Sequence, residues 1–177
     1  CAGKAGAQTV AVKSDLLTGS MLASPNLGVE LKLSERFTLE AGFHYNPFPA
    51  GGDRRWKHWF VQPELRYWMC QPYGGHFFGA NLMYGVYNVA KARLPFGLFK
   101  GIRSERYEGD FTGVGISYGY HFILSPRWGL ETSIGVGFLH TGYERYRCSH
   151  CGERTGSGNR NLVAPTKAAI SIVYMIK

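Results

Sequence analysis

The stretch FTLEAGFHYN (37–46) alternates between two kinds of side chain along its whole length. One set is apolar and occupies every second position: Phe37, Leu39, Ala41, Phe43 and Tyr45. The intervening set is small or polar: Thr38, Glu40, Gly42, His44 and Asn46. Because successive side chains of an extended chain point to opposite faces, this period of two predicts a β-strand with one apolar face.

The same alternation recurs on both sides of this stretch, near 9–17, 27–33, 57–68, 77–88, 111–122, 128–140 and 167–176. Each segment pairs a continuous apolar face with a face of glycine, serine and a few charges. This second face carries too few charged residues for a water-facing exterior. A soluble barrel places its apolar face inside, so we expect these apolar faces to meet lipid. The sequence predicts an all-β fold, an eight-stranded antiparallel transmembrane up-and-down β-barrel.

The lengths of the connections predict the orientation. Tight connections are expected at 34–37 and 124–128, and the intermediate one at 70–76 groups with them. Longer connections are expected at 47–56, 89–108 and 147–166. Small outer-membrane barrels have short periplasmic turns and longer extracellular loops. We therefore expect a periplasmic N-terminus, a separate N-terminal periplasmic segment 1–7 and a single barrel domain 8–177. Interface rings are expected from Trp56, Trp59, Trp68, Tyr118, Tyr120 and Trp128.

Composition narrows the class of protein. The 177 residues include 24 glycines and 15% aromatic residues, but only 18% are charged. No run of about 18 apolar residues exists, which excludes a transmembrane helix but not a barrel. The net charge is +8, and basic residues gather between the expected strands. Since no nucleic-acid motif occurs, we expect no nucleic acid as partner, but rather outer-membrane lipid and lipopolysaccharide.

The cysteines suggest two modifications. Cys1 fits the acylated first residue of a lipoprotein, although Ala5-Gly6-Ala7 also resembles a signal-peptidase site and the boundary could fall on a cysteine by chance. Cys148 and Cys151 form C-x-x-C, compatible with a disulfide, half a zinc site or a redox pair. A disulfide is favoured in an oxidising envelope. Cys70 is left over, and we expect a buried or turn thiol rather than a nucleophile.

Charged residues on the polar faces predict a cluster inside the barrel. They are Lys13, Asp15, Glu30, Lys32, Glu40, Glu64, Arg66, Glu131 and Lys167. Glu30 with Glu40 or Glu64 could act as an acid/base pair. We favour an ion-pair network in which Lys32, Arg66 and Lys167 neutralise the carboxylates, because buried charges must pair and side chains fill an eight-stranded interior.

Two further groups of residues are candidate binding sites. His44 and His58 are expected opposite each other near the outer rim, where Asn46 or Glu40 could complete a metal site. A polar pair is favoured, so we predict no metal and no cofactor. Basic residues between strands could bind anionic ligands, or could simply be solvated charges: Arg54, Arg55, Lys57, Arg103 and Arg106.

Several segments carry a resemblance to a known family: KHWFVQPELRYWMC (57–70), GHFFGAN (75–81), RLPFG (93–97), RYEGDFTGVGISYGY (106–120), CSHCGE (148–153) and PTKAAISIVYMIK (165–177). Together they resemble an uncharacterised family of Bacteroidota outer-membrane β-barrels, described as a domain of unknown function. The similarity runs from about Gln8, so residues 1–7 look like an addition. It implies an outer-membrane location and a small barrel, and it implies no activity.

These observations lead to three functional expectations. The first is a non-enzymatic structural or accessory subunit of an outer-membrane protein complex, for envelope biogenesis, secretion or uptake. The second is surface binding of anionic glycan or lipopolysaccharide by the basic loops. The third is a lipid A-modifying enzyme, and it is disfavoured because no serine and carboxylate converge on His140, a strand histidine of the apolar face.

Overall fold

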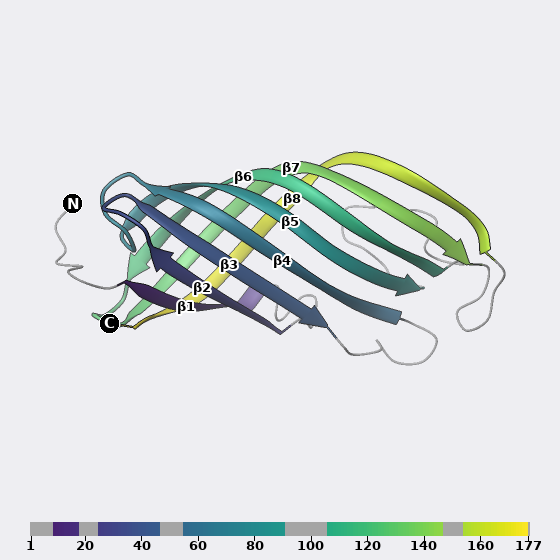
Figure 1. Ribbon diagram of the computed structural model, residues 1–177. Coiled ribbons are helices and arrows are strands. Elements are labelled where there is room, and N and C mark those ends of the chain that lie inside the picture. Colours follow the sequence, from purple (N-terminus) through teal and green to yellow (C-terminus); the bar gives the residue numbers. More distant parts are fainter. Residues whose placement is uncertain (1–8, 18–24, 47–54, 91–105, 147–153, 177) are drawn as a thin grey trace.

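The computed structural model describes residues 9–17, 25–46, 55–90, 106–146 and 154–176. Eight strands follow one another (Figure 1): β1 (Val10–Asp15), β2 (Asn26–Lys32), β3 (Phe37–Asn46), β4 (Arg55–Trp68), β5 (Gly75–Ala90), β6 (Arg106–Ile123), β7 (Trp128–Tyr146) and β8 (Arg154–Ile176). Each pairs antiparallel with its neighbour along the chain, and β1 also pairs with β8, so the sheet closes into a barrel. The prediction of an all-β fold with eight antiparallel strands is confirmed.

The polarity of the barrel is the reverse of that of a soluble protein. Large apolar side chains point outward and are exposed, among them Leu27 at 55%, Ile134 at 68% and Phe138 at 67%. The interior instead buries charged side chains such as Lys13, Glu30 and Arg66. The alternation in the sequence therefore separates an apolar outer surface from a polar core.

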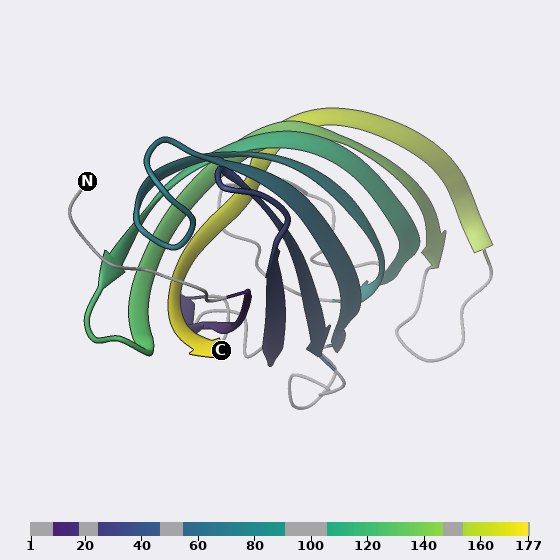
Figure 2. The ribbon, with the colours of Figure 1, turned by 60° about the vertical axis from the view of Figure 1, so that its left-hand side comes forward.

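The strands are unequal in length. β1 has 6 residues, whereas β8 has 23 and continues far beyond its pairing with β1. Figure 2 shows the long strands arching past the end of the short ones. The sequence predicted loops at 89–108 and 147–166, but β6 begins at Arg106 and β8 at Arg154. Residues 156–161 (GSGNRN) lack apolar alternation, and their strand conformation follows from the ladder with β7, as in the pair Glu144↔Ser157.

The short turns lie together at one end of the barrel, as predicted. In the turn after β2, Leu33 N donates to Phe37 O (2.9 Å), and Ser34 Oγ accepts from Phe37 N (3.2 Å). The turn after β6 repeats this arrangement: Leu124 N donates to Trp128 O, and Ser125 Oγ accepts from Trp128 N. A serine one position into each turn thus satisfies a backbone donor that the ladder leaves open. Within the described residues, no helix is both long enough and apolar enough to cross a membrane.

Candidate functional site: the charged interior

A network of ion pairs fills the barrel toward the end with the short turns. Its centre is the fully buried guanidinium of Arg66 on β4, which contacts four carboxylates. Nη1 lies 2.9 Å from Glu30, Nε lies 2.6 Å from Glu64 and Nη2 lies 3.0 Å from Glu131, while Nη2 also contacts Glu40. The planar fork of five donors in arginine suits contact with four carboxylates, whereas an ammonium has three donors.

Two ammonium groups complete the neutralisation. Lys13 Nζ contacts Glu30 and lies 2.7 Å from Glu131 and 3.6 Å from Glu40. Lys167 Nζ lies 3.1 Å from Glu64 and 3.4 Å from Glu40. Each of the four carboxylates therefore touches at least two cationic groups. This is the pairing that buried charges need, because an unpaired charge in the interior is strongly destabilising.

The structure brings together most of the residues that the sequence placed in an interior network, with one exchange. Lys32 is at the end of β2, where its residue pairs with Thr38, and in the described part of the chain it makes no ion pair with these carboxylates. Lys13, in the middle of β1, takes that role. Both lysines belong to the polar face of their strands, so alternation could not distinguish them. Their positions along the barrel axis decide which of them reaches the carboxylates.

Aromatic rings pack around Arg66 and Glu30. Trp68 is fully buried and its Nε1 donates to Thr38 Oγ1 (2.8 Å), which in turn donates to Glu30. The Arg66 guanidinium lies 4.3 Å from the centre of the Phe77 ring. Trp68 was expected in an interface ring, and that prediction is wrong. It shares the even-numbered parity of Glu64 and Arg66 on β4, which points it inward.

Glu64 receives neutral donors as well as cations. Ser117 Oγ donates to Glu64 Oε2 (3.0 Å) and Asn81 Nδ2 approaches the same oxygen at 3.5 Å. Gly79 makes this packing possible, because a Cβ there would lie 2.7 Å from the carboxyl carbon of Glu64 and would also collide with the Ser117 hydroxyl. These three residues had no signal in the sequence beyond their parity.

The turn between β4 and β5 lies next to the network, at the end of the barrel that carries the short turns. Tyr73 adopts φ of 61°, a left-handed conformation that is rare for residues other than glycine. Its ring is 1% exposed and its hydroxyl donates to Glu30 O (3.3 Å). Burial, reinforced by the charge of Glu30, raises the pKa of the Tyr73 hydroxyl above its usual range. The neutral phenol thus caps the network.

Among the described residues, the four carboxylates of the interior are all engaged in ion pairs, which suits a structural role better than that of an acid/base pair. Every carboxylate of the network contacts cations. Glu131 also has His121 Nδ1 as a neighbour, at 3.6 Å. A general acid or base must reach a substrate proton, whereas Glu30, Glu64 and Glu131 are enclosed. On the outer face, His140 Nδ1 is hydrogen-bonded to Asn161 Oδ1 (2.5 Å), so in the described residues no serine–carboxylate pair joins it.

The expected histidine pair is not formed as predicted. The register places Phe60 opposite His44 and Asn46 opposite His58, so the two histidines are not cross-strand partners. The His44 ring stacks on Phe60 with centroids 4.1 Å apart and planes 9° apart. Among the described residues, no three histidine, cysteine or carboxylate side chains gather as a metal site would require.

The remaining candidate residues lie at the rims of the barrel or outside the residues that the structure describes. Arg55 and Arg106 occupy positions on either side of Ala90, on β4 and β6, and Lys57 is exposed. Cys70 follows β4 and is disulfide-bonded, so the prediction of a thiol at this position is wrong. The other candidates fall outside the described residues: Cys1, Arg54, Arg103, Cys148 and Cys151.

Comparisons with known proteins add one finding. Neither the curated proteins nor the solved structures contain a match to the chain. A family model matches residues 1–176, which includes the segment 1–7 that the resemblance had set apart. Because this match covers nearly the whole chain, the protein belongs to the family described as protein of unknown function, DUF3575.

Proposed function

We propose that this chain is a non-enzymatic transmembrane barrel of the bacterial outer membrane, acting as a structural or accessory subunit of a protein complex there. The membrane placement is supported by the apolar outer surface. On β7 this surface runs from Trp128 to Phe138, and a strand needs roughly 9–11 residues to cross a bilayer. The short turns then face the periplasm and the longer connections face outward.

The filled interior supports a role other than transport. Eight strands enclose a space that side chains can fill, and here charged side chains with 0–3% exposure fill it at the level of Arg66 and Lys13. A solute would have to displace an ion-pair network in order to pass. The function is therefore assigned to the outer surfaces of the barrel.

The observation that carries the accessory role is the extension of the long strands. β7 continues for eight residues beyond Phe138 to Tyr146, which is about 26 Å along the strand at 3.3 Å per residue. At this level β6, β7 and β8 carry polar residues, among them Asp110, Glu144 and Asn159. A paired sheet that continues past the apolar surface offers a rigid face of mixed polarity, and non-obligate protein interfaces are about as polar as the rest of a protein surface.

Gentle detergent extraction, native electrophoresis and mass spectrometry test this proposal. We expect the native chain to migrate with stoichiometric outer-membrane proteins. Arg160→Glu on the exposed extension should weaken that association, whereas Arg127→Glu in an exposed short turn should leave it unchanged. A lone monomer in the outer-membrane fraction would overturn the accessory role, and its recovery in a soluble fraction would overturn the membrane placement.

A second candidate function is binding of anionic glycan or lipopolysaccharide at the outer rim. The register favours it, since Arg55 and Arg106 flank the same residue of β5, roughly two strand spacings apart. Binding to lipopolysaccharide vesicles should fall when Arg54, Arg55, Arg103 and Arg106 are all replaced by glutamine. Unchanged binding by that variant would sink this candidate.

A further inference from the structure

In the part of the chain that the structure describes, the barrel wall has a lateral seam, a stretch of β8 that has a paired strand on one side only. β1 pairs with β8 only from Asp15↔Ser171 to Val10↔Ile176, whereas the pairing of β8 with β7 continues to Arg154. Within the described ranges, no strand pairs with the opposite edge of β8 from Arg154 to Ile170. Figure 1 shows β8 running past the short β1 and β2.

At two points near the paired end of β8, side chains rather than a strand satisfy its backbone. Asp15 Oδ1 accepts from Ile170 N (3.1 Å), and Gln62 Nε2 reaches across to donate to Thr166 O (3.2 Å). Pro165 has no N–H to satisfy. An unpaired backbone group in lipid is costly, and these contacts remove that cost at Ile170 and Thr166.

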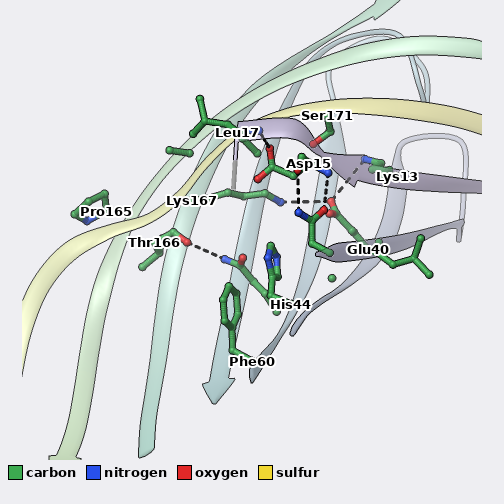
Figure 3. A pocket seen from close by; sticks show the side chains of 17 residues that line it. Lys13, Asp15, Leu17, Glu40, His44, Phe60, Pro165, Thr166, Lys167 and Ser171 are labelled. Carbon is green, nitrogen blue, oxygen red and sulfur yellow. Dashed lines mark hydrogen bonds and ion pairs between the residues drawn. The ribbon is translucent and has the colours of Figure 1, made fainter. Parts of the chain in front are cut away.

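A cavity of about 300 Å³ lies directly behind the seam (Figure 3). Its polar side holds Lys167, which pairs with Glu40, and the imidazole of His44. His44 Nδ1 is buried and has no hydrogen-bond partner among the described residues. Leu17, Leu27 and Ala168 supply apolar lining, and Leu27 is continuous with the exposed outer surface.

The polarity and the size of the cavity define its ligand. Small-molecule pockets have volumes of roughly 300–1,000 Å³, so this cavity accepts one end of a small amphiphile and not a lipid with several chains. We propose that it binds a single-chain membrane amphiphile, a fatty acid or monoacyl lipid, that enters through the seam. Its carboxylate or ester carbonyl accepts a hydrogen bond from Lys167 or His44, and its chain lies along Leu17 and Leu27. This inference rests on the proposed membrane placement.

Photolabelling tests the site. The full chain is placed in phosphatidylethanolamine and phosphatidylglycerol vesicles with a diazirine-bearing palmitic acid, irradiated and mapped by peptide mass spectrometry. We expect adducts on Lys167 and Ala169, which line the cavity, as well as on the outward-facing Ile134 and Phe138. Heat-dependent migration on gels shows that each variant is folded.

Gly42→Leu fills the cavity without backbone strain, because a Cβ there meets Gln62 O at 3.7 Å and His44 Nε2 at 3.8 Å, ordinary contact distances. We expect it to lose the cavity adducts and to keep those on the outer surface. Gly156→Leu is the control, since its Cβ meets nothing within 4 Å. Outer-surface adducts without cavity adducts in the parent chain, or cavity adducts that persist in Gly42→Leu, would overturn the pocket. Absence of adducts on the outer surface would instead overturn the membrane placement.

Discussion

Replacing Arg66 with glutamine tests whether the interior network holds the barrel together. The parent network sets three cations, Lys13, Arg66 and Lys167, against four carboxylates. The variant leaves two cations for the same four. Lys13 still touches Glu30, Glu40 and Glu131, and Lys167 still touches Glu40 and Glu64, so no carboxylate loses every partner. We therefore expect the cost of breaking one buried pair rather than four, about 3–5 kcal/mol in the free energy of unfolding.

Urea unfolding in phosphatidylcholine vesicles, followed by tryptophan fluorescence, measures this loss. Arg36→Gln is the matched control, because Arg36 is exposed in a turn and its side chain makes a single hydrogen bond among the described residues, from Nη1 to Tyr67 OH (3.1 Å). The control should change stability by about 0.5 kcal/mol or less. Adding Glu40→Gln to Arg66→Gln should recover part of the loss, since it removes a carboxylate. If Arg66→Gln costs no more than Arg36→Gln, the network does not stabilise the fold as argued.

Three further changes test other parts of the structure by the same urea measurement. Gly79→Val should cost about 1–3 kcal/mol by overpacking against Glu64, while Gly156→Val in open space should be nearly neutral, and equal costs would refute the packing argument. Ile134→Arg on the outer surface should cost about 2–4 kcal/mol in vesicles, and a change below 1 kcal/mol would contradict lipid contact. Trp68→Phe should cost about 1–3 kcal/mol because it removes the donor to Thr38, and an unchanged midpoint would show that this hydrogen bond is dispensable.

Which residues point into the charged interior could be predicted from their alternation with apolar residues, but the contacts between them could not. Glu30, Glu64 and Arg66 alternate with apolar residues, so their inward direction followed from the period of two. The same rule places Trp68 inside the barrel. It was assigned to an interface ring instead, because tryptophans are common at membrane interfaces. The choice of Lys13 over Lys32, and the offset of His44 from His58, depend on strand register, which pairs residues that are distant in the sequence.

The sequence by itself determined the number of strands, their two faces and the short turns, because alternation and turn residues are local properties of the chain. The tertiary structure alone decided how far the strands extend and where the wall opens. The segment 156–161 is in a strand because β7 lies beside it. Among the described residues, the seam arises because β1 ends at Asp15 while β8 continues. Both features come from pairing between distant segments, where the hydrogen bonds of one strand are satisfied by another.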